Sequence, residues 1–196
     1  MNEMRLFDPT GNRLYLNADE RAAFLAAARQ QAKAEVRTFC ETLHYTGCRL
    51  SEALEITPQR IELTAHQITL RSLKKRRVDI YRAVPVPPDF LDSLAGIHRV
   101  REAVKRKKAR DVPLWHWTRG HAWKIVKDVM IDAGIDDGPQ RTAKGLRHGY
   151  GVNAITKGVP LNMLCKWMGH ADIKTTAIYA NAVGAEEQDI AARMWA

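Results

Sequence analysis

The sequence predicts a mainly α (α+β) fold, in which one small β-rich region interrupts a series of helices. Apolar residues recur at helical spacing before about residue 60 and again after residue 88. Between them, apolar and polar residues alternate, and Ile, Val, Thr and Tyr are frequent, as in strands. A chain of 196 residues is long enough for one well-filled core, so we expect a single domain.

The first elements are two helices. Asn17 can cap a helix through ADERAAFLAAARQQ, where the many alanines favour the helical state. EVRTFCETLHYTG continues as a second helix and ends at Gly47, because glycine is common just past a helix C-terminus. CRLSEALEI then forms a turn in which Ser51 or its neighbours start a short helical piece.

The β-rich region extends from about Arg60 to Pro87. RIELTAHQITLRSL and VDIYRAVPVP show the alternation of strands, and KKRR lies at the tip of the hairpin between the last two runs. Helices are then predicted at DFLDSLAGIHRVREAVKRK, RGHAWKIVKDVMIDAG, TAKGLRHGYGVNAITKG and PLNMLCKWMG. The last two helices are predicted over 171–181 and 185–195.

Composition excludes several classes of protein. No segment approaches the roughly 20 apolar residues that span a bilayer, and the start MNEMRLFDPTGNRL carries no apolar run of a signal peptide, so we expect a cytoplasmic protein without a membrane partner. Cys40, Cys48 and Cys165 are odd in number and form no CxxC pair, which indicates buried thiols rather than disulfides or a zinc site.

The charge indicates the class of partner. Thirty-one Lys and Arg against 22 Asp and Glu give a formal net charge of +9, and the pI is near 9.7. Such an excess attracts polyanions, and nucleic acid is the commonest one in a cytoplasm. We therefore expect a nucleic acid as partner, although charge alone predicts no activity.

Several polar residues are suited to contact a phosphodiester, and each also has a simpler interpretation. Arg49 can pair with Glu52 three residues on, and the KKRR tip can be a solvated turn. His170 can be a histidine at a helix start, held by a backbone hydrogen bond. Tyr179 can be a packing residue. Lys144 and Arg147 are three apart and share one helical face, with His148 beside them.

In order along the chain, GCRLSEAL, a lysine on a β-hairpin, KGLRHGYG and LCKWMGHADIKTTAIYAN resemble the catalytic domain of the tyrosine recombinases, the phage integrase family. The resemblance covers about residues 17–179. It implies the integrase-type DNA breaking-rejoining fold, a helical bundle with a small antiparallel β-sheet on one side. It also implies a site-specific recombinase that cleaves and rejoins DNA through a 3′-phosphotyrosine, the strand-transfer chemistry shared with topoisomerases of type IB.

The resemblance assigns the central roles as follows. Tyr179 attacks phosphorus, while Arg49 and Arg147 grip the non-bridging oxygens, where their forks offset the charge that grows in the transition state. A hairpin lysine protonates the departing 5′ oxygen. Lys74 fits best, because it follows Ser72-Leu73, where the family places this lysine, and Lys75 is the alternative.

Two further groups complete the implied site. His170 hydrogen-bonds the phosphate, and Lys144 assists proton transfer near the tyrosine. Nearby cations are expected to make the phenol, with its ordinary pKa near 10, more reactive. Because these motifs hold no acidic cluster for a metal pair, we expect a reaction without cofactors.

The sequence departs from the family pattern in three ways. Lysine replaces the usual histidine at Lys144, and a protonated lysine suits a donor better than a base. Gly149 and Gly151 replace larger residues, which is expected to loosen that helix by roughly 1 kcal/mol per glycine. Fewer than 20 residues precede the first helix, so we expect residues 1–196 to form one catalytic domain, with a core over 17–181 and a C-terminal helix over 185–196, and without the family's N-terminal core-binding domain.

The resemblance also predicts partners. It implies double-stranded DNA as the partner and a tetrameric synapse on that DNA. The sequence is either a piece of a longer recombinase or a naturally short one, whose grip on DNA is weaker or is borrowed from a helper DNA-binding protein. Ile190, Met194 and Trp195 form a stripe that either packs on its own domain or docks on a neighbouring protomer. The alternative function is a non-catalytic DNA-binding module with the same fold, which would have no need of the phenol.

Overall fold

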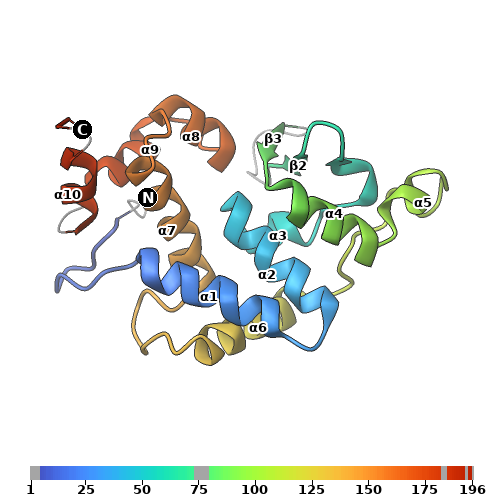
Figure 1. Ribbon diagram of the computed structural model, residues 1–196, viewed down its shortest axis with the longest axis horizontal. Coiled ribbons are helices and arrows are strands. Elements are labelled where there is room, and N and C mark those ends of the chain that lie inside the picture. The colour runs from blue at the N-terminus through green and yellow to red at the C-terminus, as the bar shows by residue number, and fades with distance from the viewer. Residues whose placement is uncertain (1–4, 73–79, 182–184, 193, 196) are drawn as a thin grey trace.

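The computed structural model describes residues 5–72, 80–181, 185–192 and 194–195, and helices make up most of it. Helix α7 (Ala143–Thr156) lies between the two halves of the molecule and contacts α1, α2, α6, α8, η2 and α10 (Figure 1). The predicted fold class, mainly helical with one small antiparallel sheet, is confirmed. Among the described helices, none is long and apolar enough to cross a membrane.

The N-terminal helices follow the predicted signals. α1 (Ala18–Gln30) begins at a capping box, in which the Asn17 side chain accepts from the Glu20 backbone N–H and the Glu20 side chain reaches back. α2 (Ala34–Thr46) ends at Gly47, whose φ of 58° is left-handed. A Cβ at Gly47 would also collide with the Tyr150 ring on α7, so the tight turn and the close approach both require glycine here.

The sheet follows a short helix. After α3 (Leu50–Ala53) and a 3₁₀ turn, η1 (Pro58–Arg60), the strands β1 (Ile61–Glu62), β2 (Gln67–Arg71) and β3 (Tyr81–Pro85) pair antiparallel in that order. Ile68 pairs with Val84, and both are buried on the core face of the sheet, as the alternation predicts. The KKRR tip, with Lys74 and Lys75, lies outside the described residues.

The single helix predicted after Pro88 is wrong, because the structure has two helices there. α4 (Pro88–Ile97) ends at His98, Arg99 takes a left-handed φ of 49°, and α5 (Val100–Val104) follows. The break has a tertiary cause. The His98 Nε2 lies 2.9 Å from the Thr38 hydroxyl of α2, and its ring packs edge-on against Trp115. These contacts turn the chain inward, although local propensity favours a continuous helix.

The remaining helices carry most of the predicted motifs. α6 (Arg119–Asp132), α7 and α8 (Leu161–Met168) occur where periodicity predicts them. The helix predicted over 171–181 starts only at α9 (Lys174–Ala177) and tightens into a 3₁₀ turn, η2 (Ile178–Asn181). This tightening turns Tyr179 inward toward α7, because 3₁₀ winding rotates each residue further than α winding does.

The last helix, α10 (Ala185–Ala192), packs on α7, and the predicted extension to Trp195 is not helical. Met194 and Trp195 are 82% and 74% exposed, so they do not pack on their own domain. The structure therefore does not support the packing interpretation of these two residues.

The buried apolar residues form two clusters. The larger one fills the space between α1, α2, α4, α6 and the sheet, and it includes Phe24, Phe39 and Leu94. The smaller one joins the N-terminal segment to α7, α8 and η2 through Leu6, Tyr15, Val152, Leu164, Met168 and Tyr179. The boundary between the two clusters follows α7, which also carries Lys144, Arg147 and His148.

Candidate functional site

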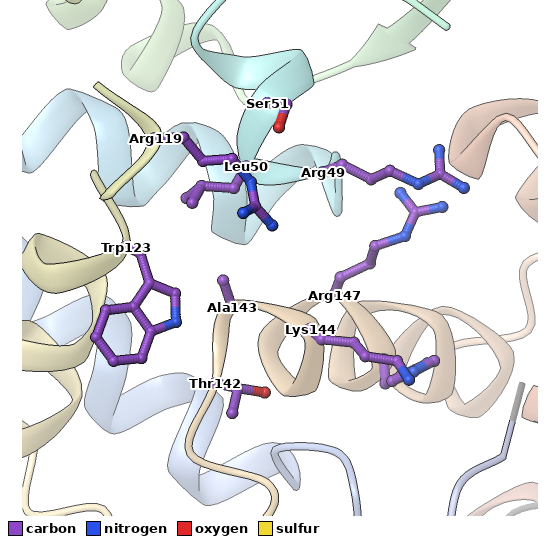
Figure 2. A pocket seen from close by; sticks show the side chains of 10 residues that line it. Arg49, Leu50, Ser51, Arg119, Trp123, Thr142, Ala143, Lys144 and Arg147 are labelled. Carbon is purple, nitrogen blue, oxygen red and sulfur yellow. The ribbon is translucent and has the colours of Figure 1, made fainter. Parts of the chain in front are cut away.

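Arg49 and Arg147 come from different elements and meet at one place. Arg49 is the N-cap residue of α3, and Arg147 lies in the second turn of α7. Their side chains extend in the same direction, so that the two guanidinium groups lie close together (Figure 2). Burial, followed by the Arg49 charge, lowers the pKa of Arg147 to about 10. Two neighbouring cations repel each other, so this place is suited to hold an anion.

Arg147 is fixed in its direction by three contacts. Its Nη1 donates to the Gly47 carbonyl at 2.6 Å, and its Nη2 donates to the Met168 carbonyl at 2.7 Å. The same Nη2 lies 3.0 Å from Nε2 of His170. Because Arg147 is buried and held from α2, α8 and the following turn, its fork is preorganised without a ligand.

His170 follows directly after the left-handed Gly169, which ends α8. Its Nδ1 lies 2.9 Å from the Thr176 hydroxyl, and its ring stacks on Tyr179 with centroids 6.3 Å apart and planes 16° from parallel. The side chain thus connects Arg147, Thr176 and Tyr179. The simpler interpretation, in which only a backbone bond holds this histidine, does not describe its surroundings.

Tyr179 is fully buried in the smaller apolar cluster. Its ring passes so close to α7 that a Cβ at Gly151 would meet it at 2.6 Å. Burial raises the pKa of the phenol above its ordinary value, although the Arg147 and Arg49 charges act to lower it. The cations thus act in the expected direction, but in the protein alone desolvation outweighs them.

The prediction that Gly149 and Gly151 loosen α7 is incomplete. A Cβ at Gly149 would collide with the Leu16 carbonyl, just as one at Gly151 would press on Tyr179. The two residues therefore allow close packing of the N-terminal segment and the phenol ring on the helix. Their effect is not only the loss of helix propensity predicted from the sequence.

His148 also contacts Tyr179, although sequence analysis assigned it no role. Its Nδ1 lies 3.0 Å from the Tyr179 hydroxyl, and its Nε2 is buried with no hydrogen-bond partner among the described residues. Burial, and then the charges of Lys144 and Arg147, lower the pKa of His148 to about 4. Its position next to Arg147 was visible in the sequence, but the contact depends on how η2 folds back on α7.

Glu52 joins Arg49 to Arg82, a residue of the site that sequence analysis missed. The Glu52 carboxylate accepts from Arg49 at 2.8 Å and from Arg82 at 2.6 Å. Burial alone would raise the pKa of Glu52, but the two guanidinium groups hold it below its ordinary value. Arg49 does pair with Glu52, as the simpler interpretation predicts, yet its side chain stays 38% exposed beside Arg147.

A pocket of about 400 Å³ opens in front of the arginines. Lys144 lines it from α7, and Arg119 and Trp123 line it from α6 (Figure 2). Of the residues predicted for the site, the structure brings together Arg49, Lys144, Arg147, His170 and Tyr179, whereas Lys74 and Lys75 lie outside the described residues. Over the described residues, no cluster of three or more His, Cys, Asp or Glu side chains is arranged to hold a metal ion.

Residues 15–184 match the model of the phage integrase family. Among curated proteins, the tyrosine recombinase XerD of Oceanobacillus iheyensis is 26% identical over 175 residues, which are 85% of this chain and 57% of that protein. XerD of Listeria monocytogenes is 27% identical over 184 residues, which are 89% of this chain and 60% of that protein. The chain thus spans somewhat more than half the length of these relatives.

Solved structures show the same fold. The XerA recombinase aligns with a TM-score of 0.76 at 21% identity, over 95% of this chain and 66% of that one. The XerH site-specific recombinase, in a pre-cleavage complex with its difH substrate, aligns with a TM-score of 0.70 at 22% identity, over 97% of this chain and 60% of that one. The predicted fold type, a helical bundle with a small antiparallel β-sheet as in tyrosine recombinase catalytic domains, is therefore confirmed.

Proposed function

Because the chain belongs to the phage integrase family, we propose that it cleaves and rejoins DNA strands at a specific site through a 3′-phosphotyrosine at Tyr179. One observation carries the proposal: Arg49, Arg147 and His170, from three separate parts of the chain, gather around the buried phenol at the edge of a basic pocket. A protein that only binds DNA would have no need to keep a phenol there.

The scissile phosphate would lie between the guanidinium groups of Arg49 and Arg147. There the two forks would bind the non-bridging oxygens and offset the charge of the transition state. The Nε2 of His170, which lies against Arg147 in the protein alone, would add a hydrogen bond to the phosphate once it carries a proton. Lys144, in the same pocket, would stabilise the charge and assist proton transfer. The 5′ leaving oxygen would take its proton from Lys74 of the hairpin, or from Lys75.

The raised pKa of Tyr179 fits an enzyme that is inactive without its substrate. In the protein alone the phenol keeps its proton and lies in an apolar cluster. Attack on phosphorus requires the phenol to reach the phosphate beside the arginines, so we expect η2 and α9 to adjust when DNA binds. The covalent link conserves the energy of the phosphodiester, so resealing would need no ATP.

DNA is the proposed partner, in line with the XerH site-specific recombinase, which is solved bound to its difH substrate. On DNA, the exposed Met194 and Trp195 would dock on a neighbouring protomer in a tetrameric synapse. Truncation after residue 184 should then weaken assembly; normal assembly and recombination would contradict this part. We further propose that residues 1–196 act as one catalytic domain in the cytoplasm, with a helper DNA-binding protein supplying additional grip.

A selection from random DNA tests the proposal and identifies the target sequence at the same time. The chain is incubated with a library of nicked duplexes that are randomised around a bridging 5′-phosphorothiolate, and adducts that survive denaturation are isolated and sequenced. We expect adducts of one sequence family with the native chain and none with Tyr179→Phe. If both proteins bind DNA and neither forms an adduct, the chain is a DNA-binding module instead.

A further inference from the structure

We propose that His148 is the base that takes the proton from Tyr179 when the phenol attacks phosphorus. The proposal rests on the function proposed above and names a group that the resemblance does not assign. It is carried by the geometry of α7 and η2, which brings His148 Nδ1 to 3.0 Å from the Tyr179 hydroxyl.

The contact has the form that proton transfer needs. A candidate base must lie within about 2.6–3.2 Å of the atom whose proton it removes. A neutral imidazole has one N–H and one lone pair. We assign the phenol O–H as the donor in this contact, which places the lone pair of His148 on Nδ1 and its proton on Nε2. Both side chains are buried, so water does not compete for the phenol proton.

The other nearby groups are less suited. Lys144, like any protonated lysine, has three donors and no lone pair. His170 has the opposite tautomer to His148: its Nε2 faces the Arg147 guanidinium, which can only donate, so the proton lies on Nδ1 toward Thr176. Of Lys144, His148 and His170, only His148 offers a lone pair to the phenol. Lys144 instead helps to keep His148 neutral, because its charge lowers the pKa of that histidine.

The steps balance. As the Tyr179 oxygen bonds to phosphorus, its proton moves to Nδ1 of His148, the bond from phosphorus to the 5′ oxygen breaks, and that oxygen takes a proton from the hairpin lysine. In rejoining, the 5′ hydroxyl attacks phosphorus and returns its proton to the hairpin lysine, the bond from phosphorus to the phenol oxygen breaks, and His148 returns its proton to that oxygen. The buried Nε2–H has no partner among the described residues, so the imidazolium is poorly stabilised and gives the proton back readily.

The experiment uses the full chain and a duplex from the selection above. His148→Asn places an amide near the position of Nδ1, so it can hold the phenol by a hydrogen bond but cannot take a proton. We expect adduct formation to slow by about 10²- to 10³-fold, in the range of general base catalysis, with DNA affinity within about threefold of native. His148→Ala should be at least as slow. A bridging phosphorothiolate removes the need for the lysine acid, so the rate reports on the phenol.

A fluorinated tyrosine at position 179 separates a base from a positioning residue. Such a phenol loses its proton more easily, so we expect it to restore His148→Asn by tenfold or more and to change the native chain little. A near-native rate for His148→Asn, or no restoration by the fluorinated phenol, would overturn the proposal. So would a loss in Lys144→Ala that the same phenol restores, because Lys144 would then be the base.

One measurement on the native chain avoids variants altogether. Nitrogen-15 NMR of labelled histidine should find His148 neutral at pH 7, with its proton on Nε2; a proton on Nδ1 would overturn the proposal. Absence of any adduct with the native chain would instead refute the proposed function itself. The two failures are therefore distinguishable.

Discussion

The guanidinium of Arg82, on β3, donates to the Glu52 carboxylate of α3 across 2.6 Å, with the two side chains 4% and 0% exposed. Arg82 also donates to the Trp167 carbonyl at 2.7 Å, and its guanidinium packs against Gly169, one residue before His170. One buried ion pair thus joins the sheet, the Arg49 turn and the His170 turn.

We predict that Glu52→Gln lowers the free energy of unfolding by about 3–5 kcal/mol, because it leaves Arg82 buried without a counterion. Urea unfolding measures the change. Asp92→Asn is the matched control, since Asp92 pairs with Arg101 at 3.6 Å with both side chains about two-thirds exposed, and it should cost less than about 1 kcal/mol. Equal losses in the two variants would contradict a structural role for the buried pair.

Gly151→Ala should disturb the phenol directly. The added methyl meets the Tyr179 ring at 2.6 Å, so the ring must shift; we expect a cost of about 1–3 kcal/mol and slower adduct formation at unchanged DNA affinity. At Gly96, inside α4, a Cβ meets no atom within 4 Å, so Gly96→Ala should leave the rate unchanged and slightly stabilise the helix. If Gly151→Ala cleaves at the native rate, the packed position of Tyr179 has no bearing on the reaction.

Acid should destabilise the fold through buried neutral histidines. Burial lowers the pKa of His44 to about 3 and that of His148 to about 4, from an ordinary value of 6.5. Between pH 6.5 and 4 the unfolded chain binds more protons than the folded one, so stability is complete above pH 6.5 and declines as the pH falls. Each histidine contributes at most about 1.4 kcal/mol per pH unit.

Thermal unfolding at several pH values tests this dependence. His44→Asn, which leaves the proposed site intact, should flatten the curve between pH 6.5 and 4. A native curve that is already flat over this interval would show that the two histidines are accessible to protons in the folded state.

DNA binding should fall steeply with salt, because each phosphate contact releases counterions. Arg119, exposed at the start of α6 and lining the pocket, is expected to contribute one such contact. Arg119→Ala should reduce the slope of log K against log salt by about 1. Arg101→Ala, at a separate hollow with Arg99 and Glu102, is the control and should leave the slope unchanged. If the native chain, Arg119→Ala and Arg101→Ala all have the same slope, Arg119 contacts no phosphate and α6 is not part of the DNA-binding face.

Most of the helices and strands could be predicted from the sequence, because helix caps and apolar periodicity are local signals. Asn17 and Gly47 mark the helix ends where the structure has them. The break at Arg99 could not be predicted, because it depends on His98 reaching Thr38 on another helix. The tight turn at η2 has no clear local signal either.

The site was partly predictable for a similar reason. Family motifs singled out Arg49, Arg147, His170 and Tyr179, and the structure brings them together. Glu52, although three residues from Arg49, gave no sign of a second partner, because Arg82 is 30 residues away in the sequence. The pKa of Tyr179 could not be deduced from neighbouring charges, since the depth of burial decides it.

The most direct test of the account is the location of the covalent bond. An adduct formed by the native chain is digested with nuclease and trypsin, and the peptide covering residues 175–193 is analysed by mass spectrometry. We predict the mass of a nucleotide phosphate on Tyr179. A nucleotide on any other residue, or DNA joined to the chain when Tyr179 is replaced by Phe, would contradict the central claim.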